Sequence, residues 1–214
     1  MWGSIMIYLY IDTSSEYLYS ALSKDNEVLS FKKSKLEHDL SAYALDEISK
    51  MFEDAKLSPD DVDKIIVVDG PGSFTGTRIG ITIAKVYAWA KKIKITTTTS
   101  LYAMALSSKF DGIHVPIINA RRGFVYAAIY DKDMKELLKP QHIEEEKLLK
   151  ELEKYNDYKF ISNDEFEDID DIEEYDPDLS KIISYTKDNE DLNPHSVNPN
   201  YLKLTAAEES KKND

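Results

Sequence analysis

The chain contains no cysteine and only four histidines among its 214 residues. The absence of cysteine excludes disulfide scaffolds, thiolate zinc sites and cysteine nucleophiles, and it is typical of a reducing compartment. No two histidines stand three or four residues apart on a predicted helix, so a helical metal pair is excluded as well. His38 opens a predicted helix, where a capping or surface role is favoured over a role as a ligand. We therefore expect no metal site.

Long hydrophobic runs and an excess of positive charge are also missing. No run of about 18 apolar residues and no basic-then-apolar leader occurs, so neither a membrane span nor a signal peptide is predicted. The formal net charge is −13. A protein that binds the phosphate backbone of a nucleic acid directly usually carries a net positive charge. We therefore expect a cytoplasmic protein that does not bind nucleic acid directly.

Much of the negative charge is local. Residues 164–178, DEFEDIDDIEEYDPD, contain ten carboxylates. Such a tract is typically a solvated surface segment or a poorly ordered loop. The alternative is an electrostatic docking surface.

The first hundred residues predict a mixed sheet with helices on its faces. Three short β-rich segments, 5–11, 17–22 and 28–33, read as an antiparallel meander. The order that follows is helix 37–55, a strand ending at residue 69, helix 77–91 and strand 93–98. A meander followed by strands that are reached through helical crossovers is typical of a mixed α/β sheet.

The remainder of the chain gives a weaker pattern. Its predicted elements are helix 100–109, two strands joined as a hairpin through residues 120–123, helix 144–155 and strand 158–162. Residues 206–214 form a polar tail that we expect to fray.

A glycine-rich loop lies between a predicted strand and a predicted helix, with glycines at positions 70, 72, 76 and 80. It is not a Walker A loop, because Gly76 is followed by Thr77 and Arg78 and not by lysine. It misses the dinucleotide fingerprint by one position, because Thr75 stands where the third glycine is required. Two interpretations remain. In the first, free amides at the helix N-terminus bind an anion with the help of Ser73, Thr75 and Arg78. In the second, the glycines only allow a tight turn and close packing.

The predicted helix over 77–91 is apolar on almost every side, with Lys85 as its lone charge between Ile79 and Ala90. A helix of this kind is covered all round. One side packs on the sheet. The other is covered either by helix 37–55 of the same chain or by another protein, where exposed apolar patches belong. The sequence leaves both open.

No catalytic nucleophile is assigned. The Ser- and Thr-rich stretches 13–15 and 96–100 lack the nucleophile-elbow pattern and an accompanying His/Asp relay. Asp12 ends the first predicted strand, where a carboxylate either meets a metal-bound phosphate or caps the following turn.

The motif GPGSFTGTRIG, residues 70–80, resembles the signature of the TsaB (YeaZ) family, the partner subunits of the bacterial tRNA threonylcarbamoyladenosine machinery. Further similarities stand in the same order along the chain: YIDTSS, EH before the first helix, INARRGFVYAAIY and NPNYLK. The resemblance spans roughly residues 5–205. Asn119 and Lys203 depart from the family's usual Asp and Arg.

This resemblance implies an α/β protein of the actin-like, Hsp70-like ATPase fold, built from two ribonuclease-H-like lobes of which the second is reduced. We expect the first lobe over 5–99, a second, smaller lobe with a C-terminal return segment over 100–205 and the polar tail over 206–214. It also implies that the chain is not the transferase. The catalytic relative, TsaD, carries His-x-x-x-His where this chain has TTSLYAMA, residues 98–105, so its metal-assisted transfer is not expected here.

The function implied is that of a non-catalytic subunit that supports TsaD in modifying tRNA next to the anticodon. TsaD is the expected partner, and the ATPase TsaE is a third component. The chain is expected to contact tRNA only as part of this complex. A homodimer is the alternative assembly. The expected partner interface is His38, Tyr43, Arg78, Ile79, Ile83, Val86 and Tyr87. A vestigial nucleotide or anion site, with ATP or ADP at the partner interface, would use Asp12, Gly72, Ser73, Thr75 and Gly76.

The rival enzyme hypothesis is a small ATPase or phosphotransferase of the same fold, using Asp12, the amides of 73–76 and Arg78. The missing lysine and the small second lobe disfavour it. Peptidase activity is an older label for this group, but the chain lacks both a metal pair and a serine triad for it.

Overall fold

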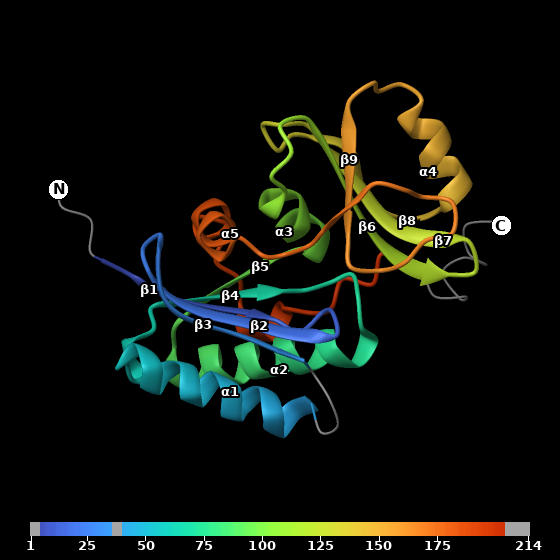
Figure 1. Cartoon of the computed structure of the whole chain (residues 1–214). Helices are drawn as coiled ribbons and strands as arrows, with labels where there is room; N and C mark the ends of the chain where they lie inside the picture. Colours follow the sequence, from blue (N-terminus) through green and yellow to red (C-terminus); the bar gives the residue numbers. More distant parts are fainter. Residues whose placement is uncertain (1–4, 36–39, 204–214) are drawn as a thin grey trace. The chain divides into compact units, whose positions relative to one another are not determined.

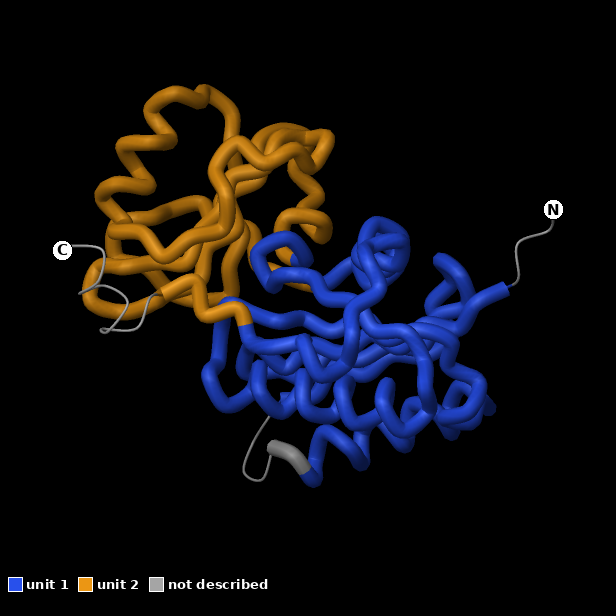
Figure 2. The backbone as a smooth tube through the Cα atoms, turned by 180° about the vertical axis from the view of Figure 1, so that it is seen from behind, with its two compact units in different colours: residues 1–103, 177–199 blue, residues 104–176, 200–214 orange. Residues whose placement is uncertain are grey.

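The computed structural model of the protein describes residues 5–35 and 40–203. The chain forms two compact units (Figure 2). Unit 1 comprises residues 1–103 and 177–199, and unit 2 comprises residues 104–176 and 200–214. Residues 100–103 and 177–199 belong to unit 1, and the latter follow unit 2 in the chain as a return segment.

Unit 1 is built on a five-stranded mixed sheet with the strand order β3-β2-β1-β4-β5. The first three strands form the predicted antiparallel meander, and β4 and β5 run parallel to β1. The strands are β1 (Ile7–Asp12), β2 (Tyr17–Lys24), β3 (Glu27–Lys35), β4 (Lys64–Val68) and β5 (Lys94–Thr98).

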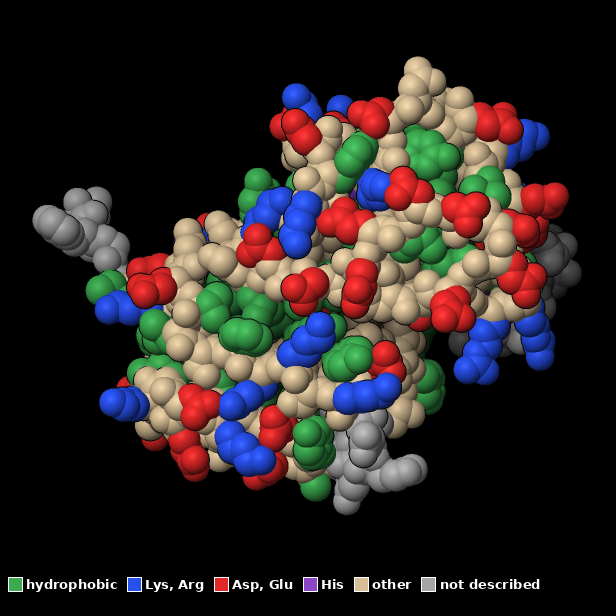
Figure 3. Space-filling model, in the orientation of Figure 1, with side chains coloured by type: hydrophobic (Ala, Val, Ile, Leu, Met, Phe, Trp, Pro, Cys, Tyr) green, Lys and Arg blue, Asp and Glu red, His purple; other side chains and the backbone are tan. Residues whose placement is uncertain are grey.

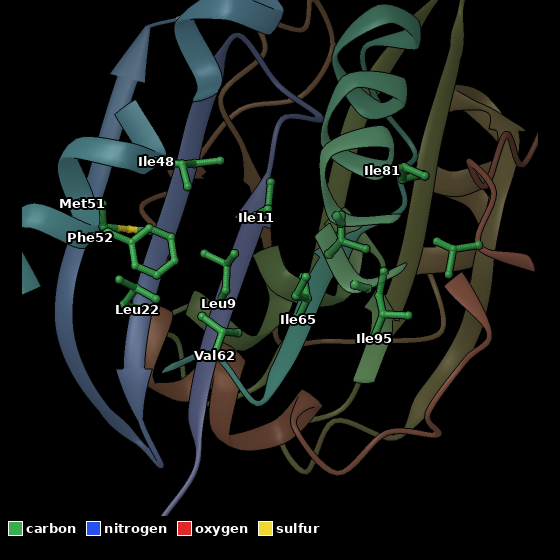
Figure 4. Close-up of a cluster of buried hydrophobic side chains, with 14 residues drawn as sticks. Leu9, Ile11, Leu22, Ile48, Met51, Phe52, Val62, Ile65, Ile81 and Ile95 are labelled. Carbon is green, nitrogen blue, oxygen red and sulfur yellow. The ribbon is translucent and has the colours of Figure 1, made fainter. Parts of the chain in front are cut away.

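Helices α1 (Leu40–Ala55) and α2 (Phe74–Lys91) lie side by side on one face of this sheet (Figure 1). Alternation along the strands directs Leu9 and Ile11 of β1 toward the helices, which contribute Met51 and Ile81 (Figure 4). All four of these side chains are buried. Met51 and Ile81 thus pack against the sheet from the inner faces of α1 and α2, and this packing fixes both helices in place.

The C-terminal part of unit 1 is bonded to the edge of the sheet. It contains α5 (Leu179–Thr186) and the short helix η2 (Pro194–Ser196). The backbone amide of Leu192 donates to the carbonyl of Ile95 in β5 (2.8 Å). Lys85, the one charged residue of α2 between Ile79 and Ala90, donates through Nζ to the carbonyl of Val197 (2.8 Å) and so anchors this segment.

Unit 2 contains a second five-stranded mixed sheet, with the order β10-β9-β6-β7-β8. The predicted hairpin is the antiparallel pair β6–β7, and β9 runs parallel to β6. The elements are α3 (Ser100–Ser107, which crosses the boundary between the units), β6 (Ile113–Arg121), β7 (Phe124–Tyr130), β8 (Glu136–Glu144), α4 (Glu145–Leu152), β9 (Tyr158–Ser162) and β10 (Ile172–Glu174).

The acidic tract is folded into unit 2. Ile169 is buried in the core of the unit, and residues 172–174 pair with β9 as β10. Glu173 accepts hydrogen bonds from Ser108 Oγ (2.6 Å) and from the backbone amide of Lys109 (2.8 Å). The alternative of a poorly ordered loop is therefore wrong, because apolar residues spaced along the tract tie it to the sheet.

Candidate functional site

The glycine-rich loop packs directly against the turn after β1. The amide of Ser73 donates to Ser14 O, and Thr13 Oγ1 donates to Gly76 O, both at 2.7 Å. A Cβ added to Gly72 would lie 2.2 Å from Ser14 O, and one added to Gly76 would lie 2.1 Å from Thr13 O. No side chain fits at these distances, so the close approach of two backbones accounts for both glycines.

Two amides at the start of α2, those of Gly76 and Thr77, have partners within the chain. Ser73 is the N-cap, and its Oγ accepts from the amide of Gly76 (3.2 Å). The amide of Thr77 donates to the carbonyl of Ser73 (2.9 Å). The helix thus begins at Phe74, three residues before the predicted start. Of the expected anion-binding side chains, those of Ser73, Thr75 and Arg78 are exposed, whereas Asp12 is buried.

Asp12 lies beside this loop and caps a turn. Its Oδ1 accepts from the amide (2.8 Å) and the hydroxyl (2.7 Å) of Ser14, and the residue is 2% exposed. Burial raises the pKa of this carboxyl above its ordinary value. Across residues 5–35 and 40–203, no three His, Asp or Glu side chains are arranged to hold a metal ion.

Asp69, which the sequence analysis did not single out, follows β4 and precedes the glycine loop. Burial raises the pKa of its carboxyl to about 7. Its Oδ1 is buried and has no hydrogen-bond partner among the described residues. A carboxylate that directly follows the apolar run Ile65–Val68 was the signal that could have identified it.

In unit 1, a groove of about 970 Å³ lies between α1 and α2, and we call it the α1–α2 groove. Its walls are almost entirely apolar. They are formed by Leu45, Ile48, Ser49, Phe52, Glu53, Leu57, Ser58, Pro59, Phe74, Thr75, Arg78, Ile79, Thr82, Ile83, Val86, Tyr87, Ala90 and Lys91. Phe52 of α1 and Tyr87 of α2 meet edge to face, but the two helices leave part of their apolar faces uncovered.

Helix α2 has one buried face and one open face. Gly80, Ile81 and Ala84 are among the residues buried against the sheet. On the other side, Val86 is 59% exposed and Phe74 is 57% exposed. The apolar character predicted around the whole helix thus serves two surfaces, and only one is covered within the described chain.

Polar contacts fix both ends of the groove. At one end Tyr87 Oη donates to Pro59 O (2.5 Å), and Lys91 forms an ion pair with Asp60. At the other end the Arg78 guanidinium lies 3.9 Å from the centre of the Phe74 ring. These contacts hold the rim side chains in place and leave the middle of the groove apolar.

Five of the seven expected interface residues line this groove: Arg78, Ile79, Ile83, Val86 and Tyr87. Tyr43 lies on α1 and is 39% exposed, but it is outside the groove lining. His38 lies outside the described residues. The sequence analysis missed Leu45, Phe74 and Trp89, all more than half exposed, although Trp89 follows Val86 at helical spacing.

Comparisons with known proteins agree with this architecture. A family model described as "TsaD: tRNA N6-adenosine threonylcarbamoyltransferase" matches residues 35–171. The chain is 32% identical to the tRNA threonylcarbamoyladenosine biosynthesis protein TsaB of Bacillus subtilis, over 95% of this chain and 96% of that protein.

Two solved structures from Pseudomonas aeruginosa share the fold. One is YeaZ, with a TM-score of 0.70 and 17% identity over 92% of this chain and all of that one. The other is an uncharacterized protein with similarity to peptidase YEAZ, with a TM-score of 0.73 and 18% identity over 93% of this chain and all of that one.

The fold is that of a two-lobed α/β protein of the actin-like class, as predicted. In its first unit, α1 and α2 border an open apolar groove. The chain belongs to the TsaB (YeaZ) family. The described residues include no helix that is both long and apolar enough to cross a membrane.

Proposed function

We propose that this chain is the non-catalytic subunit that docks a TsaD-type transferase through the α1–α2 groove during formation of threonylcarbamoyladenosine on tRNA. The single observation that carries the proposal is the open apolar groove. The B. subtilis relative is named as a protein of this biosynthesis, and the matching family model describes the transferase itself. The work would take place in the cytoplasm, where the tRNA is found.

The groove has the properties of a protein interface. Large apolar side chains are exposed together on α1 and α2, where a helix of a partner would bury them. Burial of apolar surface contributes about 25 cal/mol per Å². Because both helices are fixed to the sheet by their inner faces, little conformational entropy is lost when a partner binds.

The region around the glycine loop supports a structural role more than a catalytic one. Asp12 Oδ1 is engaged by Ser14, and the amides of Ser73 and Gly76 are engaged within the chain. A vestigial nucleotide site at the partner interface, built with ATP or ADP, and the addition of TsaE to the complex remain further parts of this proposal. A homodimer through the same groove is the alternative assembly.

The direct test is complex formation with purified TsaD. Val86→Asp places a charge in the middle of the groove, at a side chain that is exposed in the free chain, so we expect folding to be retained and the complex to be lost. Ile83→Asp should act in the same direction. The matched control is Leu137→Asp on β8, which adds the same charge at a 37% exposed apolar residue outside the groove.

Size-exclusion chromatography with light scattering and calorimetry would report the outcome. A complex that survives both groove variants contradicts the proposal. The rival hypothesis of a small ATPase predicts heat on titration of the isolated chain with ATP and magnesium, turnover, and loss of both in Asp12→Asn. Absence of binding by the isolated chain favours the docking subunit.

A further inference from the structure

Arginine is scarce in this chain and two of its arginines are adjacent. Of the 27 basic residues only three are arginines, Arg78, Arg121 and Arg122. Arginine differs from lysine in that its planar guanidinium binds an oxyanion through two parallel hydrogen bonds. In a chain that otherwise uses lysine, a pair of arginines marks a position where this geometry matters. Arg121 and Arg122 stand at the turn between β6 and β7.

The backbone at this turn is held in a conformation that residues other than glycine rarely adopt. Arg121 has φ +66° and Arg122 has φ +57°, followed by Gly123 at +74°. Left-handed φ values cost free energy for residues other than glycine. The turn is secured on both sides: the amide of Arg121 donates to Asn119 Oδ1 (2.8 Å), and Gly123 O accepts from the amide of Glu145 (2.9 Å).

Both guanidiniums are exposed, and neither forms a hydrogen bond or ion pair with another residue of the described chain. They border a pocket of about 1000 Å³ that lies wholly within unit 2. Phe124, Leu149 and Phe166 give this pocket an apolar part. Its remaining rim carries six carboxylates, from Glu144, Glu145, Glu146, Glu165, Glu167 and Asp168.

The carboxylates of this rim repel one another. The pKa of Glu145 is raised by burial and by the negative charges of Asp168 and Glu167. On the face drawn in Figure 3, acidic and basic side chains are interspersed. At this pocket, two guanidiniums that have no side-chain partner among the described residues stand beside a rim with an excess of negative charge. Of the six carboxylates, Glu144 is paired with Lys147.

We propose that the Arg121–Arg122 turn and the adjoining pocket form a second contact surface for the transferase, fitted to a segment of mixed charge. One carboxylate of that segment would bind the guanidiniums of Arg121 and Arg122, and flanking basic side chains would bind the carboxylates of the pocket rim. Charge complementarity favours a protein over RNA here, because the six carboxylates repel a polyanion. The inference rests on the proposed function and adds a polar contact to the apolar one on unit 1.

The test is the affinity for purified TsaD as a function of salt. Arg121→Glu/Arg122→Glu should raise Kd about tenfold at about 50 mM salt and less than about twofold at about 500 mM, because exposed charges are screened. Arg121→Lys/Arg122→Lys should give an intermediate loss, because charge is kept while the bidentate geometry is lost. Glu167→Lys/Asp168→Lys should weaken binding with the same salt dependence.

The matched control is Lys132→Glu/Lys135→Glu at the β7–β8 turn, which makes the same charge change at exposed lysines of the same sheet and should leave Kd unchanged. Circular dichroism and thermal melting confirm that each variant is folded. Unchanged affinity and salt dependence in both arginine variants overturns the inference while leaving the groove intact.

Two further outcomes also overturn it. If the arginine variants keep their affinity for TsaD but weaken the binding of tRNA to the assembled pair, the turn contacts RNA instead. If wild-type chain and TsaD form no complex at any salt concentration, the proposed function fails together with this inference.

Discussion

Lys64 of β4 forms an ion pair with Asp191, with Nζ 2.8 Å from Oδ1, although the lysine side chain is only 5% exposed. The same ammonium group donates to the carbonyls of Lys187 (2.7 Å) and Asn189 (2.9 Å). All three of its protons are therefore bound by the C-terminal segment. A buried charge is tolerated when it is fully paired in this way.

Lys64→Met should destabilise unit 1 by about 2 to 3 kcal/mol, because it leaves two buried carbonyls without their donor and leaves Asp191 with Lys94 alone. Urea denaturation followed by circular dichroism measures this change. Lys94→Met is the control, since Lys94 pairs with Asp191 at 2.8 Å from an exposed position. Its expected cost is about 0.5 kcal/mol. Equal costs for the two variants would mean that the burial of Lys64 has no energetic consequence.

Asp69→Asn should make stability less dependent on pH. The pKa of Asp69 is raised to about 7 in the folded chain, whereas an unfolded aspartate titrates near about 3.9. The folded state therefore holds a proton that the unfolded state releases, and stability falls as pH rises between these two values. Above about pH 7 the penalty is constant.

For this variant the gain over wild type should grow between about pH 4 and pH 7 and reach about 2 kcal/mol, since one unit of pKa corresponds to about 1.4 kcal/mol and partial exposure reduces the total. Thermal melting at a series of pH values gives the comparison. A constant difference between the two proteins at every pH would show that Asp69 does not titrate in this range.

Gly76→Ala should cost about 2 to 3 kcal/mol, because the new Cβ meets the carbonyl oxygen of Thr13, and both backbones must move. Gly123→Ala provides the contrast. Its Cβ would meet nothing within 4 Å, and only the positive φ of +74° opposes it, so about 1 kcal/mol is expected. Chemical denaturation of both variants separates close packing from backbone conformation. A milder effect at Gly76 than at Gly123 would contradict the packing explanation of the loop.

How far the sequence predicts this structure depends on the range of the forces involved. The meander, α1, β4, α2 and β5 follow from local periodicity and turn residues. The apolar excess of α2 predicts a second covered side but leaves open whether α1 or a partner covers it. The strand β8 was missed because its alternation is weak and it contains Pro140. The helix α5 was missed because its eight residues come directly after the acidic tract.

Long-range contacts lie outside the reach of such patterns. The sequence shows Lys85 as an isolated charge on an apolar helix, but its partner is the carbonyl of Val197, 112 residues away. Likewise the sequence leaves open both an anion site and a tight turn for the glycines of the loop, with the turn favoured. The position of Thr13 and Ser14 against them accounts for the packing role of Gly72 and Gly76.

Trp89 offers an internal reporter for the proposed docking. It is 63% exposed and follows the groove residue Val86 by three positions, so it stands on the open side of α2. The chain has only two tryptophans, and Trp2→Phe leaves Trp89 as the sole emitter. If TsaD covers the open side of α2, the indole leaves water and its emission should move to shorter wavelength. The shift should saturate at one TsaD per chain, and Trp2→Phe/Val86→Asp should not show it. Unchanged emission at saturating TsaD would mean that the partner enters the groove from the α1 side alone or binds elsewhere on the chain.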